Sequence, residues 1–124
     1  MELTPLIPAD RQVIERYGRS GFRVTGVVYR GAVLVFPDRT LPWEAAGAVA
    51  VTWESLIPVV EHGGVQILLL GLGQTMGTIS RKLHSACRAA GIVLEPMDTG
   101  AACRTYNVLV AEDRHVAAAL LPLT

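Results

Sequence analysis

The chain has 124 residues, a length typical of a single domain. Apolar residues make up 51% of it and the mean hydropathy is +0.39, which excludes an intrinsically disordered chain. The 11 basic residues balance 11 acidic residues, with no long run of either sign, so the composition argues against a nucleic-acid-binding protein.

Neither a membrane span nor a secretion signal is predicted. No apolar run approaches the ~20 residues that a membrane-spanning helix needs. The first ten residues lack the basic start and apolar core of a signal peptide, so we expect a cytoplasmic protein. Cys87 and Cys103 each fall on an apolar helical stripe, which favours two buried thiols over a disulfide or a metal site. We expect neither a metal nor a cofactor.

The first third of the chain is expected to hold a short helix and a β-hairpin. Residues 10–17 carry apolar side chains at helical spacing. Residues 22–25 alternate apolar with polar side chains, and a second apolar run follows at 32–36. A tight turn at residues 29–31 would join these two runs into a hairpin.

The rest of the chain alternates strands with helices. Strands are predicted at residues 49–51, 65–73, 92–97 and 115–121. Helices are predicted from Thr52 (with Pro58 delaying or kinking the start), from about Met76 to Ala90, and from Asp98 or Thr99 onward. This rhythm indicates an α/β fold with a mostly parallel, Rossmann-like central sheet flanked by helices, and the hairpin as a separate piece. The run at 65–73, apolar and ended by glycines, is predicted to be a strand buried on both faces.

A candidate ligand site lies where the predicted parallel strands end. The carboxyl ends of such strands meet at one edge of the sheet, and the N–H groups of the helices that follow attract anions. Thr52 and Trp53 are expected at the same edge. A phosphate or carboxylate ligand there is physically reasonable; the candidate residues are Gly71, Leu72, Gly73, Gln74, Thr75, Asp98, Thr99 and Arg104.

The same residues have structural explanations. The G-x-G of residues 71–73 is followed by Gly77, one residue later than a dinucleotide fingerprint requires, and the glycines can simply turn the chain after a buried strand. Asp98 or Thr99 can cap the helix, Asn107 can bond to a neighbouring loop, and Arg104 can pair with a carboxylate. His84 and Ser85 are neighbours on a helix and point about 100° apart, so they cannot pair for nucleophilic catalysis. No catalytic residues are predicted.

Three segments resemble a known family. They read G-F-R-V-T-G-V-V-Y-R-G-A-V-L-V, L-L-L-G-L-G and M-D-T-G-A-A-C-R-T-Y-N-V-L. They are similar to the small Mth-type domain shared by mitochondrial complex I assembly factor three, the adipogenesis-associated Mth-domain protein and uncharacterised prokaryotic proteins. The resemblance covers residues 22–124 of a single domain, with residues 1–21 as an N-terminal extension.

The resemblance implies a three-layer α/β fold, with a β-hairpin beside a sheet flanked by helices. The resemblance implies no established enzymatic activity and no cofactor. The role that it does imply is protein association during respiratory complex assembly. The residues that match the family's recurring pattern are Gly71, Gly73, Thr99, Tyr106 and Asn107. Because no mitochondrial presequence is visible, the chain resembles the prokaryotic members.

Two functions follow as hypotheses. The first is a non-enzymatic interaction module that assists assembly of a larger complex, with an unidentified protein partner and a homo-oligomer as a further possibility. The alternative is a small anionic-ligand-binding domain or weak enzyme that uses the strand-end crevice. An exposed apolar patch favours the first hypothesis, and an open pocket with inward-pointing N–H groups favours the second.

Overall fold

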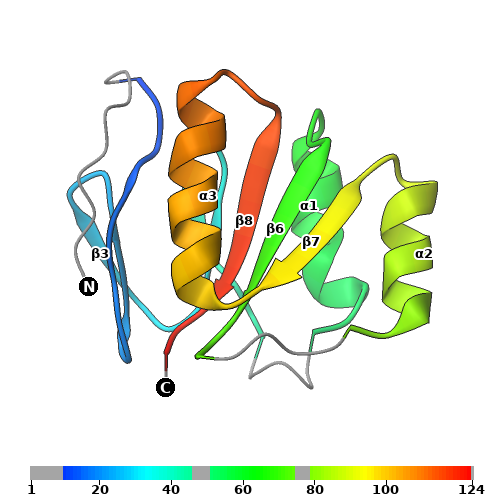
Figure 1. The fold of residues 1–124 in the computed structure, drawn as a ribbon, viewed down its shortest axis with the longest axis horizontal. Coiled ribbons are helices and arrows are strands. Elements are labelled where there is room, and N and C mark those ends of the chain that lie inside the picture. The colour runs from blue at the N-terminus through cyan, green and yellow to red at the C-terminus, as the bar shows by residue number, and fades with distance from the viewer. Residues whose placement is uncertain (1–9, 46–50, 75–78, 124) are drawn as a thin grey trace.

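The computed structural model describes residues 10–45, 51–74 and 79–123. Its strands form two sheets (Figure 1). The smaller, antiparallel sheet has the order β1 (Ile14–Tyr17), β2 (Gly21–Val24), β3 (Val27–Arg30). The larger sheet has the order β5 (Thr40–Pro42), β4 (Val33–Val35), β8 (Val116–Leu121), β6 (Ile67–Leu72), β7 (Val93–Met97).

The larger sheet is mixed. β6 pairs in parallel with β8 on one side and β7 on the other, which confirms the three parallel strands predicted near residues 67, 94 and 118. β4 pairs antiparallel with both β8 and β5, so the half of the sheet nearest the N-terminus is antiparallel. Pro96 lies on the edge strand β7, where a missing N–H costs no interior ladder bond.

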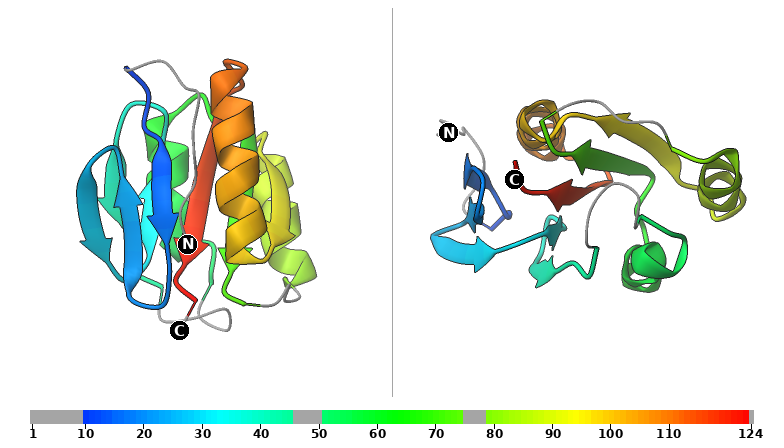
Figure 2. Two further views of the ribbon diagram at one scale, coloured as in Figure 1. Left: turned by 60° about the vertical axis from the view of Figure 1, so that its left-hand side comes forward. Right: turned by 90° about the horizontal axis from the view of Figure 1, so that it is seen from below.

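The helices cover both faces of this sheet and confirm the three-layer α/β fold (Figure 2). A short 3₁₀ turn, η2 (Glu54–Leu56), leads into α1 (Ile57–His62), and α2 (Arg81–Ala89) shares the apolar cluster on that face. The opposite face is covered by α3 (Thr99–Ala111) and by the smaller sheet.

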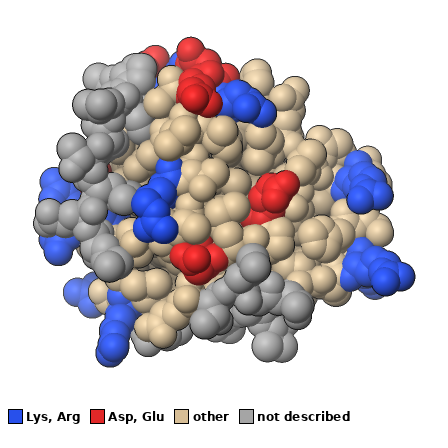
Figure 3. Space-filling view, viewed as in Figure 1, with Lys and Arg blue, Asp and Glu red and all other residues tan. Residues whose placement is uncertain are grey.

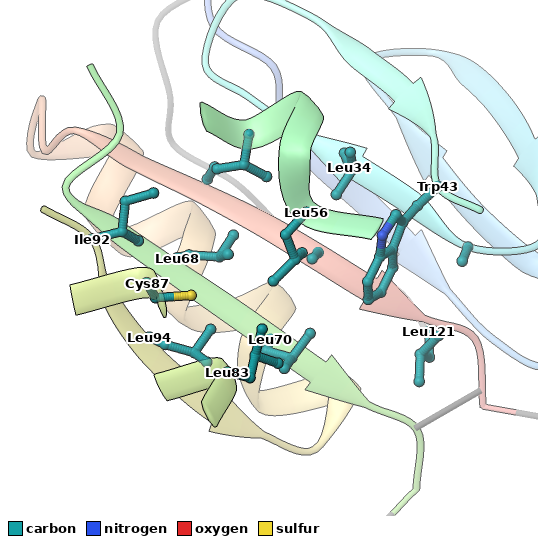
Figure 4. Close-up of a cluster of buried hydrophobic side chains, with 14 of the residues drawn as sticks. Leu34, Trp43, Leu56, Leu68, Leu70, Leu83, Cys87, Ile92, Leu94 and Leu121 are labelled. Carbon is teal, nitrogen blue, oxygen red and sulfur yellow. The ribbon is translucent and has the colours of Figure 1, made fainter. Parts of the chain in front are cut away.

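Strand β6 supplies side chains to both clusters. Leu68 and Leu70 point into the cluster formed with α1 and α2, while Leu69 points into the cluster formed with α3. All three are at most 1% exposed, as predicted for a strand buried on both faces. The first of these clusters also holds Trp43, whose indole N–H donates to the Ser55 carbonyl oxygen at 2.9 Å (Figure 4).

The N-terminal predictions need correction. Residues 10–17 do not form a helix: β1 is a strand that pairs with β2. The hairpin partner of β2 is β3, not residues 32–36, and the turn lies at Thr25 and Gly26 rather than at residues 29–31. Thr25 has φ 45° and Gly26 φ 81°, the backbone that a two-residue hairpin turn requires. The run at 32–36 belongs to the larger sheet through β4.

Smaller corrections concern the middle of the chain. The strand predicted at 49–51 falls mainly outside the described residues, and Val51 is not in a strand. The helix after Thr52 does start late, with Pro58 in its first turn, where the absent N–H has no helical partner to lose. On this helix Val59 is buried and Val60 is exposed. Helix α2 begins at Arg81, capped by Ser80, which is later than predicted.

Asn107 of α3 joins the smaller sheet to the rest of the domain. Its Oδ1 accepts a hydrogen bond from the N–H of Ile14 at 3.1 Å, and its Nδ2 donates to the Ile14 carbonyl oxygen at 2.9 Å. The hydroxyl of Tyr106, the residue before Asn107, donates to the Gln12 carbonyl oxygen at 3.0 Å. The side chains of α3 therefore take the place of a neighbouring strand along the free edge of β1.

We predict that Asn107→Leu lowers the free energy of unfolding by about 2–4 kcal/mol, because it leaves two buried backbone groups of Ile14 without partners. The adjacent Val108→Ala is the control, since Val108 is 56% exposed and its truncation should cost less than about 0.5 kcal/mol. Urea unfolding followed by circular dichroism measures both. Equal stability of the two variants would contradict this role of Asn107.

Candidate functional site

The predicted ligand residues lie where β6 ends against the start of α3. The Thr99 hydroxyl accepts a hydrogen bond from the N–H of Gly73 at 2.9 Å and donates to the carbonyl oxygen of Leu121. The Thr99 N–H donates to the Gly73 carbonyl oxygen at 2.8 Å. Thr99 is fully buried, so this strand-end junction (Gly71, Gly73, Thr99 and Leu121) ties β6 and β8 to α3.

Glycine occupies positions 71 and 73 of the junction for two different structural reasons. A Cβ on Gly71 would lie 3.0 Å from Leu120 Cδ2 and 3.1 Å from Thr99 Cα, so the close approach of α3 to β6 favours glycine there. Gly73 has φ +90°, a backbone conformation that favours glycine. Gly73 therefore serves the turn that the structural explanation proposed, whereas Gly71 lies within β6 and serves the close approach of α3, which the sequence did not predict.

Asp98 and Arg104 both have protein partners. Asp98 is the N-cap of α3, and its Oδ1 accepts a hydrogen bond from the Ala101 N–H at 2.9 Å. Arg104, six residues further along α3, donates to the Tyr17 hydroxyl of β1 at 3.2 Å. The same hydroxyl would lie 2.8 Å from a Cβ on Gly100, so α3 and β1 approach closely here.

The remaining predicted site residues do not converge on one another. Leu72 is buried in the cluster beneath α1 and α2, Gln74 is exposed, and Thr75 lies outside the described residues. Thr52 and Trp53 line a hollow of about 270 Å³ together with the start of α2. The N–H of Gly73 and the N–H of Thr99 are both used within the protein, while binding of an anionic ligand at this edge stays a prediction.

Burial and one hydrogen bond shift pKa values elsewhere in the protein. Burial raises the pKa of the Cys103 thiol to about 12 and raises those of Cys87 and Tyr106 above their usual ranges. The hydrogen bond between Asp38 Oδ1 and His62 Nε2, 2.6 Å apart, lowers the pKa of the Asp38 carboxyl. The His62 ring also stacks on Phe36, with centroids 4.1 Å apart. The described residues hold no group of three or more His, Cys, Asp or Glu side chains placed to bind a metal ion.

A second surface lies on the smaller sheet. Arg16, Arg23 and Arg30, one from each of its strands, line a hollow of about 430 Å³ together with Val28. We call these four residues and the hollow the arginine face. In Figure 3 basic side chains gather over the smaller sheet, whereas the surface between α3 and α2 carries few charges.

Sequence reasoning missed the arginine face because it depends on strand register. The sequence pattern predicts a helix at Arg16 and a turn at Arg30, and so places neither residue beside Arg23. The available signal was Thr25-Gly26, a two-residue turn between the alternating residues 22–24 and the valines that follow. Thr at a positive φ is uncommon, which is why the pair did not stand out from the sequence.

The sequence comparison identifies the family. A family model described as "Protein of unknown function (DUF498/DUF598)" matches residues 14–121. The chain belongs to this family. The match includes both sheets and α1, α2 and α3.

Relatives include bacterial and mitochondrial proteins. An uncharacterized protein of Rhodobacter capsulatus is 37% identical over 110 residues, which cover 89% of this chain and 84% of the relative. NADH dehydrogenase [ubiquinone] 1 alpha subcomplex assembly factor 3 of Xenopus tropicalis is 32% identical over 115 residues, or 92% of this chain and 63% of the relative. The human protein of that name is 29% identical over 116 residues, which cover 92% of this chain and 62% of the relative. The chain thus spans less than two thirds of these assembly factors.

Solved structures share the fold. A crystal structure described as an outer membrane protein from Bartonella henselae matches with a TM-score of 0.84 and 34% identity, covering 92% of this chain and 97% of that one. A Bordetella pertussis protein described as a Mth938-like domain matches with a TM-score of 0.80 and 26% identity, covering 99% and 93%. These matches confirm the predicted resemblance to the Mth-type domain. Among the described residues of this chain, no helix has the length and apolar character needed to cross a membrane.

We predict that Thr99→Val lowers the free energy of unfolding by about 1–3 kcal/mol. Valine has nearly the same shape as threonine but no hydroxyl, so the Gly73 N–H and the Leu121 carbonyl oxygen would be left buried without a hydrogen-bond partner. Thr99→Ser keeps the hydroxyl and should cost less. Urea titration of the two variants separates the hydrogen bonds from the methyl group. A Thr99→Val variant more stable than Thr99→Ser would contradict the structural role of the hydroxyl.

We predict that neither cysteine of the folded protein reacts with the thiol reagent DTNB at about pH 8, because only the thiolate attacks and burial disfavours it. Cys87 is 1% exposed and Cys103 fully buried. Unfolding in concentrated guanidinium chloride should release both thiols to the reagent, as absorbance shows. Rapid reaction of a thiol in the native protein would show that one of them is accessible.

Proposed function

We propose that the chain is a protein-interaction module that assists the assembly of a larger complex. The observation that supports this most directly is the relation to proteins named as assembly factors of NADH dehydrogenase, over about nine tenths of this chain. Assembly by these relatives requires contact with other proteins. The shared domain is a natural candidate for that contact.

The surface of the smaller sheet favours this function. Val27 and Val28 on β3 are 52% and 73% exposed, and β3 is the edge strand of its sheet. An edge strand offers backbone N–H and C=O groups with which a partner strand can pair, and burial of the exposed valines under a partner is favourable. The alternative function, binding of a small anion at the strand-end junction, would need N–H groups that point into an open pocket. The Gly73 N–H instead donates to the Thr99 hydroxyl, so the junction supports this alternative less well.

The test is complementation in a bacterial strain from which the native gene has been deleted. We expect deletion to lower the amount of assembled NADH dehydrogenase on native gels, and the wild-type gene to restore it. Val28→Asp should restore it poorly, because a charge on the edge strand opposes contact with an apolar partner. Val93→Asp, at the far edge strand β7 and 56% exposed, is the matched control and should restore it fully.

Circular dichroism checks that both variants fold. A deletion strain with a normal amount of assembled enzyme would contradict the proposed function. Equal complementation by both variants would show that the edge of β3 is not the contact surface.

A further inference from the structure

We propose that the arginine face binds an extended acidic segment of a partner protein, with carboxylates pairing the guanidinium groups of Arg16, Arg23 and Arg30. The choice of a protein as the ligand rests on the proposed function. The location and the charge of the segment follow from the smaller sheet itself.

The register of the smaller sheet places the four side chains on one face. Arg16 lies opposite Arg23 across β1 and β2, and Arg23 lies opposite Val28 across β2 and β3. Directly opposed residues share a face of a sheet, and Arg30, two residues after Val28, shares it as well. This is the outer face, because the alternate residues Phe22 and Val24 are buried against α3.

A glycine lets β2 and β3 approach closely beside this hollow. Gly21 is the partner of Arg30 in the ladder, and a Cβ on it would lie 2.0 Å from the Tyr29 carbonyl oxygen. The hollow of about 430 Å³ lies among Gly21 and the arginines. Neighbouring strands are about 4.8 Å apart, so the arginines span about 10 Å across the three strands.

The charge of Arg30 is available to a ligand. Glu15 lies 3.0 Å from the Nε of Arg23, whereas within the described part of the chain Arg30 has no acidic partner. Arg16 lies directly opposite Arg23, so a segment lying in the hollow passes all three guanidinium groups. Carboxylates there would form charge-assisted hydrogen bonds with them.

The neighbouring valine distinguishes a peptide segment from a small anion. Val28 is 73% exposed in the same cross-strand row as Arg16 and Arg23. A free phosphate would engage the arginines and leave Val28 uncovered. An extended segment places every second side chain on one face, about 6.6 Å apart, so it can pair carboxylates with the arginines while it also covers Val28.

The test is a binding titration by fluorescence anisotropy at low salt. The probe is a labelled seven-residue peptide in which glutamate alternates with valine, and the control peptide has glutamine in place of every glutamate. We expect the acidic peptide to bind at least about tenfold more tightly than the control, with affinity that falls as salt rises. Arg23→Gln and Arg30→Gln should each weaken binding about fivefold.

Arg81→Gln on α2 is the matched control, since it removes one exposed arginine from another part of the molecule, and it should leave binding unchanged. Equal binding of both peptides, or an equal loss with Arg81→Gln, would overturn the proposal. Inorganic phosphate that displaces the peptide at low concentration would indicate a small-anion site instead. Binding to phosphatidylglycerol vesicles without binding to the peptide would indicate a membrane surface instead.

The deletion strain separates this inference from the proposed function. If Arg23→Gln and Arg30→Gln restore the assembled enzyme as well as wild type does, the acidic segment is not the relevant partner and the assembly role stands. If deletion has no effect on assembly while the peptide still binds, the assembly role fails and the binding surface stands.

Discussion

The parallel pairing of β6 with β8 is the interaction on which the other layers depend. Six residue pairs align these strands, from Ile67 with Val116 to Leu72 with Leu121. Both strands are buried on both faces, so each needs a cover on either side. The side chains of the alanines at 117–119 are small, which allows α3 and the layer on the opposite face to approach β8 closely. The two apolar clusters on the two faces follow from this one pair.

Polar side chains of α3 then attach the outer elements to that centre. Thr99 joins the end of β6 to the end of β8, and Asn107 and Tyr106 hold the segment that includes β1. The five residues that match the family's recurring pattern (Gly71, Gly73, Thr99, Tyr106 and Asn107) all lie at these joints. Within this chain the pattern therefore describes how α3 is attached to strands, and each of these residues has a structural role without a ligand.

The surface features lie on the smaller sheet, away from the joints. The inner face of that sheet packs on α3, while its outer face carries the arginines and its edge carries the valines. A partner that binds there would contact a sheet held to the domain by Asn107. The same hydrogen bonds that stabilise the fold thus also hold the candidate contact surface in place.

The sequence by itself determined β6, β7, β8 and the start of α3, because these depend on local signals: continuous apolar runs ended by glycine or polar residues, and an Asp98 side chain that caps its own helix. Only the tertiary structure decided that Ile14–Tyr17 is a strand. Its apolar spacing also suits a helix, and the partners that stabilise the strand are β2 and an asparagine far along the chain. The same holds for the strand-end glycines, since the close approach of α3 to Gly71 arises only when the layers pack. The arginine face likewise required the register of three strands, which is set by a turn with an uncommon backbone at Thr25.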